Sequence, residues 1–339
     1  MARTPQSLWV YLGVGRICFV TRTDVHNSDH TPQSRTDDWT ATVLDKLDQV
    51  GQIAKAVKAD AVLDNGDFFD VKSPSRNSHG LVRRTADVQS RYPCPTFANV
   101  GNHDCVYGNI EFLDQQPLGV LFSTGVFQRC YDDHELLVRK GDLSVRVVGI
   151  PYHGPNYNLE RFKVKKRDED YLVAMAHVLA SPKGGTMFEG EDIVKYDDLC
   201  NLAPEVDVWV MGHWHKDQGI VEQQPGKWIV NIGSLTRGSL SQDDLNRSPG
   251  VSILTFTKEG LEIKRQNLKI RPPGEIFDLE RRVQQESRAM TMDAFMSSLQ
   301  STMVEAKGGS LIEKIEGQDV PDAVRERAIL YLEKARVDE

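Results

Sequence analysis

Short apolar runs alternate with longer amphipathic segments through the first part of the chain. Apolar runs bounded by turn residues predict buried strands, and apolar residues at helical spacing predict helices. The pattern predicts strands over 17–20, 60–63 and 96–100, and helices over 36–59 and 81–90. Because the order is strand, helix, strand in 17–63, this part predicts a βαβ unit with parallel strands and a right-handed crossover.

Strands outnumber helices in the second half of the chain. Apolar runs typical of strands occur at 145–150, 172–176, 206–211 and 228–232. The segments 251–256 and 261–264 are expected to form a closing antiparallel pair. We therefore expect an α/β protein in which two packed sheets are flanked by helices.

The clearest boundary is the segment Arg271-Pro272-Pro273-Gly274, after which the pattern becomes helical. We expect helices over 277–288 and from Pro321, with a methionine-rich apolar stripe between them at 292–303. Such a stripe is more typical of a helical core than of a groove for a partner. The chain is expected to divide into residues 1–270 and a small helical segment, 271–339.

The composition is that of a globular protein with an acidic balance. Hydrophobic residues make up 40% of the 339 residues, which is ample for a sizeable core. The 41 basic and 49 acidic residues give a net charge of −8, which argues against a nucleic-acid cradle built from excess Lys and Arg. If the substrate is a phosphate ester, something other than side-chain cations must neutralise it.

None of the five cysteines belongs to a CxxC pair; they are Cys18, Cys94, Cys105, Cys130 and Cys200. Neither a disulfide framework nor a thiolate zinc site is indicated, and a cytoplasmic location is expected. Arg16 interrupts the apolar patch over 8–14, which favours a leading strand or an over-extended start over a signal peptide. No stretch approaches the ~18 apolar residues of a membrane span, so no membrane association is expected.

Residues that can bind metals follow several of the predicted strands. In order, these blocks are Asp24-x-His26, Gly66-Asp67-x-x-Asp70, Gly101-Asn102-His103-Asp104, His177 and Gly212-His213-x-His215. Each block is weak alone, because a lone histidine after a strand is more often a satisfied polar residue than a ligand. Two adjacent divalent cations need a bridging anion, and mixed carboxylate, amide and imidazole ligands suit manganese, iron or zinc. Together the blocks predict a site for two metal ions.

This ordered set resembles the calcineurin-like metallophosphoesterase superfamily, whose motif series it matches in every block. The resemblance implies a four-layer α-β-β-α sandwich of two mixed sheets, with a small helical C-terminal extension. It also implies two sets of metal ligands that share Asp67 as the bridge. One set is Asp24, His26, Asp67 and His215, and the other is Asp67, Asn102, His177 and His213.

The resemblance also implies catalytic roles for two neighbours of the ligands. His103 is expected to stabilise the transition state and to protonate the leaving oxygen, and Asp104 is expected to orient its ring. Asp70 is expected either to contact a ligand residue or to be a solvated loop carboxylate. His153, after the strand over 145–150, and Arg237, near Gly233-Ser234, are further candidates for residues beside the ligands or the substrate.

The superfamily includes protein phosphatases, cyclic-nucleotide phosphodiesterases, nucleotidases and DNA nucleases. Gly66 to Asp70 followed by Ser73-Pro74-Ser75, with Gly233-Ser234 after the histidine pair, is most similar to the SbcD-type DNA repair nucleases. This implies a DNA exonuclease or endonuclease that uses Mn²⁺, with Fe, Zn or Mg as alternatives. It also implies an SbcC-type coiled-coil ABC ATPase as a partner, and a homodimer.

Two departures from that family pattern affect the interpretation. Asp70 stands where archaeal and eukaryotic relatives have a histidine, which favours the bacterial or phage type. The segment after Pro273 is short and helical for a DNA-capping domain plus an ATPase-binding arm. Two other functions stay open: a metallophosphoesterase for small nucleotides or phosphoproteins, and a non-catalytic scaffold with the same fold.

Overall fold

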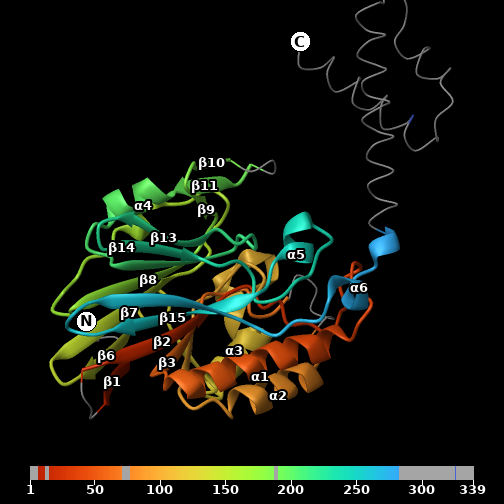
Figure 1. Cartoon of the computed structure of the whole chain (residues 1–339), viewed down its shortest axis with the longest axis horizontal. Coiled ribbons are helices and arrows are strands. Elements are labelled where there is room, and N and C mark those ends of the chain that lie inside the picture. Colours follow the sequence, from red (N-terminus) through yellow and green to blue (C-terminus); the bar gives the residue numbers. More distant parts are fainter. Residues whose placement is uncertain (1–6, 12–14, 71–76, 187–189, 282–324, 326–339) are drawn as a thin grey trace, which may run out of the picture. The chain divides into compact units, whose positions relative to one another are not determined.

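The computed structural model of the chain describes residues 7–11, 15–70, 77–186, 190–281 and 325 (Figure 1). The chain divides into two compact units, residues 1–277 and 278–339. Four sequence predictions lie wholly or mostly outside the described residues: the helix over 277–288, the methionine-rich stripe, the helix from Pro321 and the segment Ser73-Pro74-Ser75.

Two mixed sheets form the first unit. The larger sheet has the spatial order β1 (Ser7–Tyr11), β6 (Leu136–Lys140), β7 (Leu143–Ile150), β8 (Tyr171–His177), β12 (Val208–Gly212), β14 (Lys227–Asn231) and β13 (Gly219–Gln224). The smaller sheet has the order β16 (Leu261–Asn267), β15 (Gly250–Phe256), β2 (Ile17–Arg22), β3 (Ala61–Asp64), β4 (Thr96–Ala98) and β5 (Phe127–Arg129). The strands β2 to β5 run parallel, as do β7, β8, β12 and β14.

A third, small sheet has the order β10 (Gly185–Thr186), β11 (Asp192–Lys195) and β9 (Ala180–Ser181). Among the described residues of the first unit, the α-helices are α1 (Trp39–Val57), α2 (His79–Gln89), α3 (Pro117–Ser123), α4 (Tyr196–Leu202), α5 (Gln242–Asn246) and α6 (Pro273–Ile276). The 3₁₀ turns are η2 (Val106–Gly108), η3 (Ile110–Gln115) and η4 (Leu159–Phe162). Among the described residues, no helix has the length and apolar character that a membrane span requires.

Side chains from the two large sheets fill the space between them. Phe19 of β2 and Leu63 of β3 belong to the same buried cluster as Val147, Val173 and Val210 of the larger sheet. Because side chains alternate across a strand, the remaining residues of β2 and β3 face α1, α2 and α3. The outer face of the larger sheet packs against α4 and η4. The unit is therefore the four-layer α-β-β-α sandwich that the sequence predicted (Figure 1).

Helix α1 forms where the sequence provides both caps and an apolar face. The side chain of Asp38 accepts a hydrogen bond from the Ala41 N–H, and Lys58 ends the helix in the left-handed conformation. The buried residues of the helix are Trp39, Val43, Lys46, Leu47, Val50 and Ala54. This helix connects β2 to the parallel strand β3, which confirms the predicted βαβ unit.

The hydrophobic pattern found the central strands and missed strands at the edge of the larger sheet or next to it. The antiparallel pair of β15 and β16 confirms the prediction for 251–264. Strand β13 was missed because it is an edge strand whose residues are only partly buried, so its sequence carries no continuous apolar run. Strand β6 was missed because it is short and ends in Arg139 and Lys140, before a tight connection to β7.

Asn65, at the end of β3, joins the two large sheets. Its Nδ2 donates to the carbonyl oxygens of Ala176 in β8, at 2.9 Å, and Val210 in β12, at 2.8 Å. Its Oδ1 accepts from Nδ2 of Asn99, at 2.9 Å, and Asn99 also donates to the carbonyl oxygen of Ile150 in β7, at 3.0 Å. Both amides are fully buried. This amide pair fixes the carboxyl-terminal ends of β3, β7, β8 and β12 against one another.

A second buried polar contact lies on the opposite face of the smaller sheet. Arg22 of β2 and Asp64 of β3 are paired in register, and Nε of Arg22 donates to Oδ2 of Asp64 at 2.6 Å. Both side chains are wholly buried. The guanidinium also donates to the Tyr92 hydroxyl and lies over the ring of Phe68. Asp64, which had no predicted role, therefore neutralises the charge of Arg22 inside the helix-facing core.

We predict that Asp64→Ala lowers the free energy of unfolding by about 3 kcal/mol, because it leaves the Arg22 guanidinium buried without a counter-charge. Urea unfolding in the presence of a chelator measures this loss. The matched control is Glu262→Ala, which removes one partner of an exposed ion pair with Lys264 and should cost less than about 1 kcal/mol. Equal losses in the two variants would contradict the assigned role of Asp64.

We also predict that Asn65→Ala lowers the free energy of unfolding by at least about 2 kcal/mol, since the carbonyl oxygens of Ala176 and Val210 and the amide of Asn99 each lose a partner. The control is Asn201→Ala, in which an exposed amide of α4 loses a long surface contact with Gln224. Urea unfolding of both variants with chelator gives the comparison. A loss in Asn65→Ala no larger than in the control would show that the amide pair does not hold the sheets together.

Candidate metal centre

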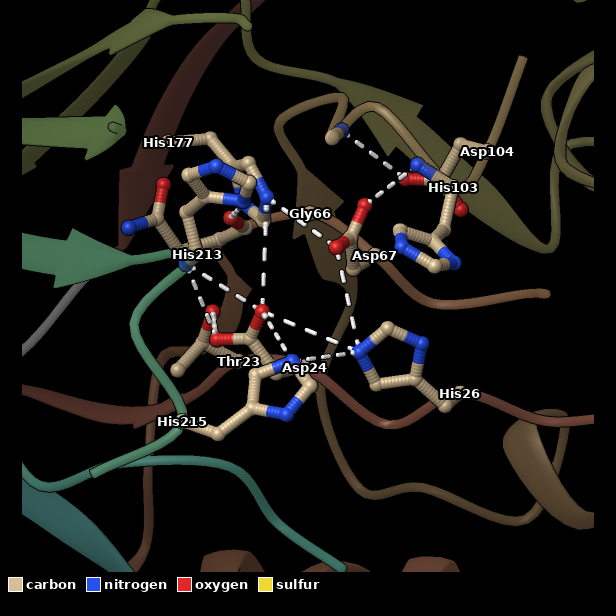
Figure 2. Close-up of polar contacts among 12 residues, drawn as sticks. Thr23, Asp24, His26, Gly66, Asp67, His103, Asp104, His177, His213 and His215 are labelled. Atoms are coloured by element: carbon tan, nitrogen blue, oxygen red, sulfur yellow. Dashed lines mark hydrogen bonds and ion pairs between the residues drawn. The ribbon is translucent and has the colours of Figure 1, made fainter. Parts of the chain in front are cut away.

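Polar side chains at the carboxyl-terminal ends of β2, β3, β8 and β12 converge on one point (Figure 2). Because Asn65 joins the ends of both sheets, ligands supplied by the two sheets meet there. The structure brings together two groups of side chains whose potential ligand atoms lie within 4.8 Å of one another. The groups are Asp24, His26, Asp67 and His215, and Asp67, His177 and His213. Asp67 belongs to both groups.

In the first group, two imidazole nitrogens face each other. Nε2 of His26 lies 2.8 Å from Nε2 of His215. Oδ1 of Asp24 is 3.7 Å from the His215 nitrogen, and Oδ2 of Asp67 is 3.8 Å from the His26 nitrogen. Burial and the nearby ring of His215 lower the pKa of His26 well below its usual value. The His26 ring is therefore held neutral, with a nitrogen directed at the two carboxylates.

In the second group, His177 is oriented by the backbone. Its Nδ1 donates to the carbonyl oxygen of Asn65 at 2.7 Å, which leaves Nε2 facing Oδ2 of Asp67 at 3.3 Å. Although burial opposes the charged ring, the carboxylate of Asp67 raises the pKa of His177 to about 10. A lone pair on each of these two atoms would repel the other. A positive charge between them, carried by a proton or a metal ion, removes that repulsion.

Three ligand atoms are buried without a hydrogen bond. Within the described part of the chain, Oδ2 of Asp67, Nε2 of His177 and Oδ1 of Asn102 have no hydrogen-bond partner. Buried polar atoms are normally satisfied, so the Asp67 oxygen and the His177 nitrogen, which face each other at 3.3 Å, indicate a missing partner. Carboxylate, amide and imidazole donors suit borderline divalent cations. The Asp and His cluster therefore fits a site for two metal ions.

The backbone at the candidate ligands is strained. Among the described residues, six other than glycine have positive φ, and four of them are Asp24 (52°), His26 (50°), Asp67 (53°) and His213 (79°). The left-handed region costs an ordinary residue about 1–2 kcal/mol. Strained conformations of this kind cluster at functional sites, where the surrounding structure holds them in place. The four strained ligands support the assignment of this point as the functional site.

Glycines beside the ligands allow the loops to approach closely. A Cβ atom on Gly101 would collide with the carboxylate and the backbone of Asp67. A Cβ atom on Gly212 would collide with the hydroxyl of Thr23, which donates to Oδ2 of Asp24 at 2.7 Å. The glycines that precede Asn102 and His213 in the motifs are therefore required by the packing of the loops that carry Asp24 and Asp67.

His103 lies beside the first group, and its ring is held by Asp70. Its backbone N–H donates to Oδ1 of Asp67 at 2.7 Å, and its ring lies edge-to-face with His26 at 4.7 Å. Nδ1 of the ring contacts Oδ1 of Asp70 at 3.2 Å. Asp70 therefore contacts His103, which is not a candidate ligand, and the expectation that Asp70 contacts a ligand residue stays a prediction.

The expectation that Asp104 orients the His103 ring is wrong. The carboxylate of Asp104 instead accepts from the backbone N–H groups of Phe69 and Gly101, at 2.9 Å each. Burial and the neighbouring Asp67 raise the pKa of Asp104 well above its usual value. The reason for the difference is geometric: Asp104 points into the core and joins the two loops that follow β3 and β4, whereas Asp70 lies at the surface beside the ring.

Two further candidates make their hydrogen bonds with residues outside the two ligand groups. His153 is held within its own loop, because Nδ1 contacts the carbonyl oxygen of Pro151 and Nε2 accepts from the Asn158 N–H. Arg237 is buried, and its Nη2 donates to the carbonyl oxygen of Arg271 at 2.8 Å. Neither side chain belongs to the two ligand groups.

The candidate ligand cluster and Arg237 line two different cavities. A cavity of about 400 Å³ lies beside the first group and is lined by His26, Asp70 and His215, together with Trp39. A larger cavity of about 1000 Å³ lies along α1 and is lined by Arg237 and Arg271, with none of the metal-site residues. Arg237 therefore lines the larger cavity, and its expected place beside the substrate stays a prediction.

Sequence reasoning missed two residues of the site, Asn65 and Glu191. Asn65 left a signal, since it is a polar residue at the end of a buried run, immediately before Gly66. Glu191 left none, because it lies 22 positions before His213 and reaches Nε2 of that ring only through the fold, at 2.9 Å. Although partial burial opposes it, the hydrogen bonds from His213 and Tyr157 lower the pKa of Glu191, so it is a carboxylate.

Comparison with known proteins gives the following similarities. The family model described as "Calcineurin-like phosphoesterase" matches residues 22–217. The DNA double-strand break repair protein Mre11 of Haloferax volcanii is 26% identical over 257 residues, which cover 72% of this chain and 49% of that protein. The protein of the same name from Methanosarcina acetivorans is 26% identical over 229 residues, or 66% of this chain and 34% of that protein.

The match spans about half the length of these curated relatives, or less. Among solved structures, a dimetal phosphatase from Danio rerio is similar with a TM-score of 0.49 and 11% identity, over 74% of this chain and 96% of that one. The family match covers more than half of the sequence and includes the loops that carry Asp24, Asp67, His177, His213 and His215. The chain belongs to the calcineurin-like phosphoesterase family.

Proposed function

We propose that this protein is a two-metal phosphodiester hydrolase that cleaves DNA and uses Mn²⁺. The observation that carries the proposal is the position of Asp67, whose carboxylate is shared by two groups of imidazole and carboxylate donors. One buried oxygen of Asp67 faces ligand nitrogens from both groups, His26 at 3.8 Å and His177 at 3.3 Å. A shared carboxylate is the bridging anion that two adjacent cations require.

The proposed ligand sets combine the two groups with Asn102, which the family motif adds to the second group. Asp24, His26, Asp67 and His215 would hold one cation, and Asp67, Asn102, His177 and His213 would hold the other. Two bound cations would supply Lewis-acid polarisation of the phosphate, a water of lowered pKa and neutralisation of the charge that develops during in-line displacement. The net charge of −8 does not oppose a phosphate substrate, because the positive charge comes from the site itself.

His103 supplies the proton in this proposal. Its ring lies beside His26 and is exposed at the mouth of the site, with about one fifth of the side chain accessible. Asp70 fixes Nδ1, which leaves Nε2 as the nitrogen that can hold a proton for the leaving oxygen. General-acid assistance of this kind typically contributes about 10²–10⁴ in rate. Asp104 contributes by fixing the loop that carries His103.

DNA as the substrate is supported by the relatives, which are named as DNA double-strand break repair proteins. We further propose an SbcC-type ATPase as a partner and a homodimer as the working form. Residues 271–339 would bind the partner or cap the DNA, and 1–270 would form the catalytic domain. The five cysteines are free thiols, which is consistent with the cytoplasmic location that we propose.

The assay that tests the substrate uses purified full-length protein with Mn²⁺ on single-stranded, blunt-ended and hairpin DNA, and on simple phosphomonoesters. We expect cleavage of at least one DNA substrate. Strong phosphomonoester turnover without DNA cleavage would overturn the nuclease in favour of a phosphatase for small nucleotides or phosphoproteins. No bound metal on metal analysis, together with unchanged stability on chelation, would favour a non-catalytic scaffold.

We predict that Asp67→Ala and His103→Ala both lower DNA cleavage by at least about 10²-fold, and that only Asp67→Ala loses bound metal. Asp67→Ala removes the carboxylate shared by both groups, whereas His103 lies outside them. Metal analysis after gel filtration measures the two Mn²⁺ equivalents expected in wild type and His103→Ala. The control is Glu222→Ala, which alters an exposed residue of β13 and should keep wild-type DNA cleavage and both Mn²⁺ equivalents. Two Mn²⁺ equivalents bound to Asp67→Ala would contradict the proposal that the Asp67 carboxylate bridges the two cations.

We predict that Asp70→Ala lowers kcat by about tenfold or more without changing metal content, because the His103 ring loses its contact with the Asp70 carboxylate. Asp70→Asn keeps an oxygen opposite Nδ1 and should recover part of the rate. Steady-state kinetics on the DNA substrate that the wild type cleaves fastest gives kcat for each variant. Metal analysis of the same samples gives the metal content. An unchanged kcat in Asp70→Ala would refute the role of Asp70 in holding the ring.

A further inference from the structure

Glu191 makes the contact that fixes the ring of His213. Oε1 of Glu191 lies 2.9 Å from Nε2 of His213 and accepts from the Tyr157 hydroxyl at 2.6 Å. The Glu191 side chain is mostly buried, with 19% accessible. The contact comes from a distant segment, since Glu191 immediately precedes β11 and His213 follows β12. No sequence motif of the metal site includes Glu191 or Tyr157.

The contact determines which nitrogen of His213 can bind a cation. A carboxylate only accepts hydrogen bonds, so the proton of the His213 ring must be on Nε2. Nδ1 then carries the lone pair. In His177 the arrangement is reversed, because Nδ1 donates to the Asn65 carbonyl and Nε2 carries the lone pair. Histidines that bind metals usually donate their other N–H to a carboxylate or a carbonyl. Here His213 donates to the carboxylate of Glu191, and His177 donates to the carbonyl of Asn65.

The same contacts connect the two histidines of the second group. The Tyr157 hydroxyl accepts from the backbone N–H of Leu179 at 3.0 Å, and Leu179 is two residues after His177. Strands β9 and β11 pair in parallel, with Ala180 opposite Val194, so the segment after His177 lies beside the segment that begins at Glu191. Tyr157 and Glu191 therefore join the backbone after His177 to the ring of His213.

We propose that Glu191, supported by Tyr157, is a positioning residue that holds His213 with Nδ1 directed at the second cation. Glu191 is outside the group formed by Asp67, His177 and His213, so it acts through the ring and is not itself a ligand. This inference rests on the proposed function, because it requires that the second group binds a cation.

The test is calorimetric titration of the metal-free full chain with Mn²⁺. Wild-type protein is expected to bind two ions. In Glu191→Ala, the affinity for one ion falls by about 10–100-fold, and the affinity for the other stays within about twofold. Glu191→Gln keeps an oxygen that accepts from Nε2 and should lose less than Glu191→Ala. Asp192→Ala is the matched control, because it removes an exposed carboxylate at the next position and should bind as wild type does.

Histidine NMR gives a readout that is independent of affinity. In protein loaded with Zn²⁺ and labelled with ¹⁵N-histidine, the signal of His213 is identified by its loss in His213→Ala. We expect a slowly exchanging proton on Nε2 in wild type and Asp192→Ala, and loss of that slow exchange in Glu191→Ala. A His213 proton on Nδ1 in the wild type would overturn the proposal.

A double-mutant cycle tests the role of Tyr157. Tyr157→Phe should lower the affinity for the same ion several-fold, and the double variant Tyr157→Phe, Glu191→Ala should bind no more weakly than Glu191→Ala alone. Additive losses would overturn the coupling of the two residues. Wild-type protein that binds fewer than two ions would overturn the proposed function itself. Two ions in wild type with unchanged binding in Glu191→Ala would overturn only the role of Glu191.

Discussion

The structure depends on the buried contact between Asn65 and the ends of two strands in the opposite sheet. A sandwich of two sheets is held mainly by apolar side chains, and apolar contacts alone do not fix how far one sheet slides over the other. The hydrogen bonds from Asn65 to the carbonyl oxygens of Ala176 and Val210 set that position. Since His177 is the last residue of one of those strands and His213 follows the other, the same bonds place the histidines of one sheet opposite the carboxylates of the other.

The side chains of the resulting cluster do not satisfy one another's charges and hydrogen bonds. Carboxylates and imidazole nitrogens approach to 3.3–4.0 Å, and the Asp67 oxygen and His177 nitrogen that face each other lack hydrogen bonds within the described residues. Four ligand residues also occupy the left-handed region of the backbone. Two cations between these donors would offset both the repulsion and the strain. The stability of the fold and the occupancy of the site are therefore linked, because binding to the native state stabilises it.

The sequence predicted the parts of the fold and site that are encoded locally. Apolar runs located the central strands, and the polar residues that follow them include the side chains that the structure brings together, because parallel strands bring their carboxyl ends to one edge. Contacts that depend on side-chain direction could not be predicted. Asp70 and Asp104 are both near His103 in the motifs, and only the structure shows that Asp70 holds the ring. Glu191 was missed because its contact with His213 depends on the pairing of β9 with β11.

The central claim is that one carboxylate bridges two metal ions. Crystals of the full chain grown with Mn²⁺ and measured at the manganese absorption edge test it most directly. The account predicts two anomalous peaks about 3.5–4 Å apart, one on each side of Oδ2 of Asp67. A single peak, or two peaks of which either lies away from Asp67, would contradict it.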